Sequence, residues 1–192
     1  MTSFLSELCI YTGRIRLFDR RDWVVWLAWV GLLAALCAAT LSFLLVGAAR
    51  GASFPAEAWL VPVGAAIFAL AAGVDAIGHR TIYKEEIRRA ESLVHAVTIF
   101  CGIASCVLLC AAFRAGRAAS IPAAVLTVLS VLYSLLDEAF HWRRYVSSRS
   151  DRVETWSHVF IFVGHLTMMA AWWAWLLGGY GGVAETLRSL AS

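Results

Sequence analysis

Residues 23–49 read WVVWLAWVGLLAALCAATLSFLLVGAA, a run of 27 residues without a charged side chain. A membrane-spanning helix needs roughly 20 predominantly apolar residues, with a working range of about 17–25. The run is too long for the apolar region of a signal peptide, and more than twenty residues, several of them charged, precede it. We therefore interpret it as a retained transmembrane helix.

Four further apolar runs follow this first one. The chain is 61% hydrophobic and 15% charged over 192 residues, which is more apolar than soluble domains usually are. In lipid the backbone must satisfy its own hydrogen bonds, and the alternating strands of a barrel are absent. The sequence therefore predicts an all-α integral membrane protein with five transmembrane helices. The further runs are 58–74, 92–113, 121–136 (long enough when 118–120 are added) and 156–180.

The basic residues predict the orientation of these helices. Twelve of the sixteen Lys and Arg residues lie before residue 23, in 80–89 or in 143–152, which fall on one side if five spans alternate. The positive-inside rule then places the N-terminus in the cytoplasm and the C-terminus outside, and we expect a bacterial plasma membrane. Because the net charge of +3 follows from this topology, the chain gives no basis for nucleic-acid binding.

Two segments of the chain repeat one pattern. Residues 74–95 read VDAIGHRTIYKEEIRRAESLVH, and residues 136–158 read LDEAFHWRRYVSSRSDRVETWSH. Each runs Asp-x3-His, a polar stretch and Glu-x3-His, which indicates an internal repeat. We expect one anchor helix followed by a four-helix bundle of two tandem helical hairpins. The predicted units are 1–22 (cytoplasmic or interfacial), 23–49 (anchor), 58–113 and 118–180 (hairpins) and 181–192 (short external tail).

Four of the five histidines follow an acid by four positions, although only 13 of the 192 residues are acidic. Residues i and i+4 lie on one helix face, so each pair offers an oxygen and a nitrogen in the same direction. All four pairs fall at the cytoplasmic ends of predicted spans, where ionisable side chains usually face the interior and carry function. The pairs are Asp75 and His79, Glu91 and His95, Asp137 and His141, and Glu154 and His158.

This ligand set predicts a metal site. Mixed carboxylate and imidazole groups favour iron or manganese first and zinc second, and eight candidates exceed what one octahedral ion takes, which suggests two ions. Glu138, beside Asp137, is a further candidate as a bridging group or as the partner of a ligand histidine. Asp137 matches the repeat, so we prefer it as the direct ligand.

The pattern resembles the ligands of ferritin-like di-iron and di-manganese carboxylate four-helix bundles, which use Glu-x-x-His motifs on two of their helices. Glu138 and His141 have this spacing, whereas the other pairs are one residue longer. The resemblance is one of ligand pattern within 75–158. It implies a dinuclear iron or manganese centre inside the bundle.

Two residues are candidates for the apolar side of the site. His165 lies seven residues after His158 on the same predicted helix face, and Tyr133 lies one turn before Asp137. Both are candidate catalytic residues beneath the metals, but ordinary packing, with a hydrogen bond to a neighbouring helix for His165, is the favoured interpretation of each. Residues 4–18 also predict a short amphipathic helix on the inner membrane surface.

The function that these features predict is oxygen-dependent oxidation of a lipid-soluble substrate at the cytoplasmic leaflet, supported by an electron donor. The same ligands also fit a dizinc lipid hydrolase and a metal-ion transporter or sensor, although a carrier usually binds its ion near the membrane midplane. Haem ligation is less favoured, because the four histidines lie at one depth. A structural subunit with helix-end ion pairs is the simplest alternative.

Overall fold

The structure is a computed structural model, and it describes residues 3–82, 89–146 and 152–191. All regular elements in these residues are helices, as the sequence predicts. Five of the helices, α2 to α6, are long and apolar enough to cross a membrane. The elements are α1 (Phe4–Gly13), η1 (Arg14–Leu17), α2 (Arg20–Ala49), α3 (Ala56–Thr81), α4 (Arg89–Ala115), α5 (Arg117–Val146), α6 (Arg152–Leu177) and α7 (Val183–Ala191).

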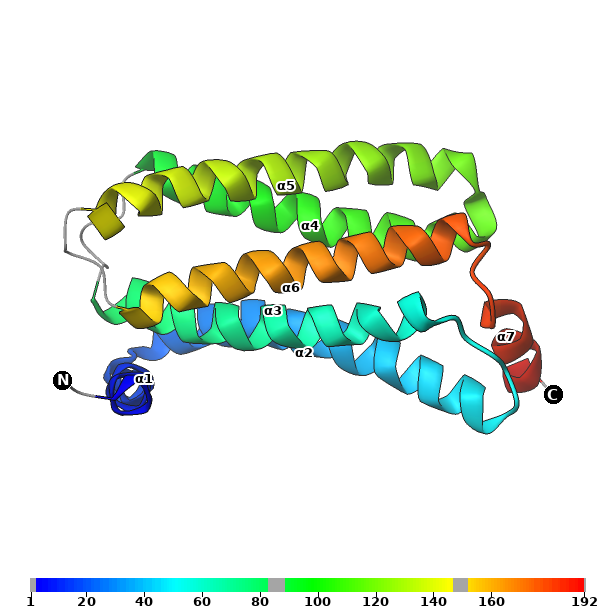
Figure 1. The fold of residues 1–192 in the computed structure, drawn as a ribbon, viewed down its shortest axis with the longest axis horizontal. Helices are drawn as coiled ribbons and strands as arrows, with labels where there is room; N and C mark the ends of the chain where they lie inside the picture. The colour runs from blue at the N-terminus through cyan, green and yellow to red at the C-terminus, as the bar shows by residue number, and fades with distance from the viewer. Residues whose placement is uncertain (1–2, 83–88, 147–151, 192) are drawn as a thin grey trace.

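The five long helices run side by side along the molecule (Figure 1). α3 packs along α6, α4 packs along α5, and α2 packs on α3. The α3 and α6 backbones come closest where Gly64 faces Gly164, because a Cβ atom on either glycine would collide with the backbone of the other helix. Small residues permit this approach between membrane helices. The crossing fixes the spacing of the two helices that carry Asp75 and His158.

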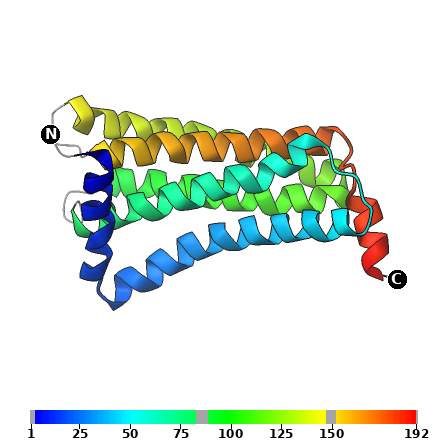
Figure 2. The same ribbon diagram turned by 60° about the horizontal axis from the view of Figure 1, so that its bottom comes forward.

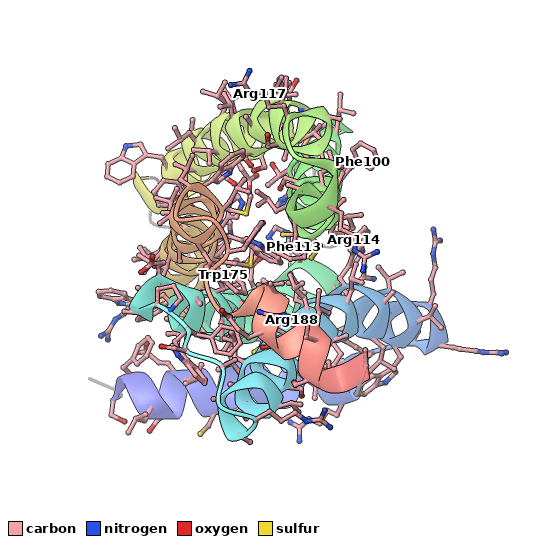
Figure 3. All side chains as sticks on the ribbon, turned by 90° about the vertical axis from the view of Figure 1, so that its right-hand side faces the viewer. Phe100, Phe113, Arg114, Arg117, Trp175 and Arg188 are labelled. Atoms are coloured by element: carbon pink, nitrogen blue, oxygen red, sulfur yellow. The ribbon has the colours of Figure 1, made fainter. Side chains whose placement is uncertain are left out.

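Large apolar side chains cover the outside of the long helices. Leu70 is 74% exposed, and Phe100 (Figure 3), Val107 and Val125 are also more than half exposed. A soluble surface rarely carries contiguous apolar patches of this kind, and such patches mark contact with lipid or with other proteins. The five apolar helices are compatible with membrane insertion.

The end of the bundle where α2 begins is crossed by α1, which lies nearly perpendicular to the long helices (Figure 2). This confirms the helix predicted within 4–18, with the 3-10 turn η1 completing it. Asp19 starts α2 with a capping box. Asp22 of the same turn accepts a hydrogen bond from Arg80 over 3.0 Å, so the start of α2 is tied to the end of α3.

Aromatic side chains close the opposite end of the bundle, seen face-on in Figure 3. The Tyr180 ring packs edge-on against Trp175 and Phe113, with ring centroids 5.1 and 6.1 Å away. Its hydroxyl donates to the Leu109 carbonyl, and burial raises the pKa of Tyr180 to about 12. The predicted tail contains a helix, α7, which packs against α2.

Candidate metal centre

The centre of the site is a buried group of one carboxylate and two imidazoles. Asp75 and His79 lie one turn apart on α3, and Asp75 Oδ2 is 3.2 Å from His79 Nε2. His158 approaches from α6, with its Nε2 3.1 Å from Asp75 Oδ1. Donor atoms of the three side chains lie within 4.8 Å of one another. This group therefore has the composition and spacing to hold a metal ion.

A second carboxylate orients His158 from the other side of its ring. Glu138 of α5 places Oε1 3.0 Å from His158 Nδ1. The His158 side chain is 2% exposed, so both ring nitrogens meet carboxylates away from solvent. A carboxylate that accepts one imidazole proton leaves the other nitrogen free to ligate, which is the arrangement usual around protein-bound metals.

His95 and Asp137 extend the cluster to α4 and α5. His95 Nε2 is 3.4 Å from Asp137 Oδ1, and the His95 and His79 rings meet edge-on with centroids 5.2 Å apart. Contacts thus run from Asp137 through His95, His79, Asp75 and His158 to Glu138. Asp137 and Glu138 are adjacent, but they point about 100° apart around α5, which explains how they reach histidines on two different helices.

The structure describes the other three predicted ligands to different extents. Glu154 is completely buried on α6, one turn before His158. Glu91 and His141 lie on α4 and α5, but their side chains are outside the described part of the structure. The described geometry therefore brings together six of the nine predicted ligands, and the roles of the other three stay predictions.

Helix α1 covers the outer side of this end. The Tyr11 side chain is 1% exposed and packs so closely on Gly78 that a Cβ atom there would overlap its phenol oxygen. Glu7 pairs with Arg152 at 3.4 Å, which ties α1 to the start of α6. Sequence reasoning did not select Tyr11 because nothing near it in the chain identifies Gly78, the residue before His79, as its contact.

His165 lies deeper in the bundle than the six clustered residues. Its ring stacks on Phe68 of α3 with centroids 5.4 Å apart, and its Nε2 is 3.3 Å from the Ser130 hydroxyl of α5. Tyr133 is half-buried on α5, and the described residues offer it no hydrogen bond. The sequence located His165 but not Ser130 or Phe68, because these contacts depend on how α6 is rotated against α3 and α5.

The donor set decides which ions fit. One carboxylate and two imidazoles suit iron, manganese and zinc, whereas calcium and magnesium prefer oxygen ligands alone. None of the five cysteines belongs to the group of Asp75, His79 and His158, so this group offers no thiolate ligand. Comparison of the chain with protein-family models, curated proteins and solved structures gave no match.

Proposed function

We propose that this protein is a membrane-embedded metalloenzyme that uses oxygen to oxidise a lipid-soluble substrate at the cytoplasmic leaflet. The observation that carries the proposal is the clamp on His158, whose ring lies between Asp75 and Glu138 with His79 beside it. A helix-end ion pair needs one acid for each histidine. Two carboxylates on opposite nitrogens of a buried imidazole instead match a metal ligand and its supporting acid.

The internal repeat supports two ions in place of one. Asp75 and Asp137 are 62 positions apart, and His95 and His158 are 63 apart. Asp75 contacts His158, and Asp137 contacts His95, so matching residues of the two predicted repeats make similar contacts between helices. A second ion then takes Asp137 and His95, with Glu91 and His141 as the further ligands of that half.

Both ions would be iron or manganese, which would supply redox chemistry by passing electrons from the external donor to oxygen. The chain itself orients and encloses the site. Glu138 accepts the Nδ1 proton of His158 and fixes the direction of its Nε2 lone pair. Tyr11 and α1 shield the α3 and α6 side of the cluster from water. The apolar helix surfaces admit a substrate from lipid, and an electron donor reaches the site from the cytoplasm.

The placement in the membrane is part of the same proposal. Basic residues gather at the α1 end, where Arg14, Arg16, Arg20 and Arg21 surround the start of α2, and an excess of Arg and Lys marks cytoplasmic segments. The clustered acids and histidines lie at this end, so the substrate is expected in the inner leaflet. A site so close to one surface does not suit a through-pathway for ions.

Oxygen uptake by the reconstituted protein tests this function. Nanodisc samples loaded with Fe²⁺ or Mn²⁺ are given a reductant and a panel of long-chain alkanes, alcohols and quinols. Uptake dependent on one substrate class, and lost in Asp75→Asn and His158→Ala, is the expected result. A Glu185→Gln variant serves as the control because Glu185 is exposed on α7, at the opposite end of the bundle. No uptake with either metal would contradict the proposal, and ester hydrolysis by the Zn²⁺ form would favour a dizinc lipid hydrolase.

A further inference from the structure

His165 is a polar side chain in an apolar part of the bundle. It lies on α6 about two turns from His158, is 2% exposed and stacks on Phe68. No carboxylate contacts its ring among the described residues, and a buried imidazole without a charged partner is neutral. A neutral imidazole has one nitrogen that donates and one that accepts.

The Ser130 hydroxyl determines which ring nitrogen of His165 carries the proton. Ser130 Oγ donates its proton to the Thr127 carbonyl over 2.9 Å, so its lone pairs are left to accept. The 3.3 Å contact with His165 Nε2 is therefore assigned as an Nε2–H donor to Ser130. The proton then resides on Nε2, and Nδ1 carries a bare lone pair. Among the described residues, the ring makes one hydrogen bond, the contact of Nε2 with Ser130 Oγ.

The bundle leaves room around Gly102 of α4, beside the Nε2 edge of this ring. Gly102 of α4 faces His165, and a Cβ atom on Gly102 would meet one heavy atom within 4 Å, the His165 Nε2 at 4.0 Å. Gly102 is also the residue equivalent to His165 in the first hairpin, 63 positions earlier. One hairpin thus supplies an imidazole at this depth, and the other supplies a residue without a side chain.

We propose that His165 Nδ1 binds the hydroxyl group of a lipid-soluble ligand, such as a long-chain alcohol, phenol or quinol. An unpaired buried acceptor costs free energy, and a ligand O–H group removes that cost. An ether or ketone of the same shape has no proton to donate and would leave Nδ1 unpaired. The inference rests on the proposed function only in naming this ligand as the substrate. About 10 Å of helix rise separates the anchored hydroxyl from His158.

Nuclear magnetic resonance of histidine nitrogens tests the site directly. Full-length protein in nanodiscs, labelled with ¹⁵N-histidine and supplied with diamagnetic Zn²⁺, is titrated with 1-dodecanol or with its methyl ether. The expected result is a saturable shift of one bare-nitrogen signal with the alcohol only. The shift should be absent in His165→Phe, which keeps a ring to stack on Phe68.

With a matched pair of serine variants, the test does not depend on whether the His165→Phe protein folds. Ser130→Ala removes the acceptor that holds the proton on Nε2, so alcohol binding should weaken about tenfold. Ser105→Ala is the control, because Ser105 is equally buried and its hydroxyl likewise bonds to the carbonyl three residues earlier. Ser105→Ala should bind the alcohol like the parent protein.

Several outcomes would overturn the inference. These are an equal response to alcohol and ether, no response to either, a response that persists in His165→Phe, or an equal effect of the two serine variants. The signals of His79 and His158 report zinc binding in the same samples. Zinc binding without an alcohol response would leave the proposed function standing, and an alcohol response without zinc binding would leave the hydroxyl site standing.

Discussion

The surroundings of His158 distinguish most clearly between a metal ligand and the partner in a helix-end ion pair. An exposed helix-end ion pair contributes only about 0.3–0.5 kcal/mol, and one acid is enough to make it. His158 is instead almost fully buried, with Asp75 and Glu138 on its two nitrogens. The cost of burying these polar groups is offset only if each has its partner, and a bound cation would add to that compensation.

The substitution Glu138→Gln tests the supporting role of this carboxylate. The amide is a weaker acceptor for the His158 Nδ1 proton, so metal affinity should fall about 10–100-fold while the protein still folds. Competition with a chromophoric chelator measures the affinity. Glu185→Gln should leave it unchanged, because Glu185 is exposed on α7 at the opposite end of the bundle. Equal affinities for Glu138→Gln and the parent protein would remove Glu138 from the site.

Sequence reasoning reached the contacts that lie within one helix. The pair Asp75 and His79 follows from i, i+4 geometry, and the structure confirms it. The contact of Asp75 with His158 lies between α3 and α6, and no local pattern specifies the rotation of one helix against another. Ser130 was missed for the same reason, since a serine in an apolar helix usually bonds its own backbone.

At the scale of elements, the α3 and α6 pair determines the shape of the centre. Gly64 and Gly164 bring the two backbones together, and Asp75 and His158 extend from these helices toward the same end. Any residue that separates α3 from α6 at the crossing also separates the two donors. The position of the candidate metal centre therefore depends on two glycines that lie far from it along the helices.

A glycine series tests this dependence. Gly164→Ala places a methyl group against the α3 backbone, which should lower the stability by about 1–3 kcal/mol and weaken metal binding. Gly31→Ala is the matched control, because its Cβ atom would meet nothing within 4 Å, and an alanine in a helix is favoured by about 0.5–1 kcal/mol. Thermal unfolding in detergent measures both. A Gly164→Ala protein as stable as Gly31→Ala would contradict the close crossing.

The extents of the helices were only partly predictable. Apolar runs mark the part of a helix that meets lipid, so the run ending at 136 gave no sign that α5 continues to Val146. The start of α2 lies before Trp23 because Asp19 and Asp22 form a capping box. Polar residues extend both helices beyond the apolar segment, and hydropathy alone does not register them.

At the scale of the whole molecule, charge distribution and site position point to the same side of the membrane. Nine of the described Arg residues lie at the α1 end, in 14–21, at 80 and 89 and in 143–152, where the clustered acids and histidines also lie. The sequence predicted from periodicity and charge that these acids and histidines gather at one end of the helices, and the structure brings six of them together there. The sequence did not predict that α3 pairs with α6 and α4 with α5, because pairing among four apolar helices depends on side-chain fit.

Cysteine labelling tests the orientation. Cys9 is exposed on α1, so in a variant with the other four cysteines changed to alanine, a membrane-impermeant maleimide should label inverted vesicles and not intact cells. Moving the single cysteine to the far end, as Ser53→Cys with Cys9→Ala, should reverse the pattern. Labelling of Cys9 in intact cells would place the candidate centre on the external side.

The metal content of the purified protein tests the central claim most directly. Protein isolated without chelators is analysed by plasma mass spectrometry beside an Asp75→Asn, His158→Ala double variant and the Glu185→Gln control. The account predicts about two iron or manganese ions per chain in the parent protein and the control, with a large loss in the double variant. A parent protein without stoichiometric metal, or a double variant that keeps it, would contradict the account.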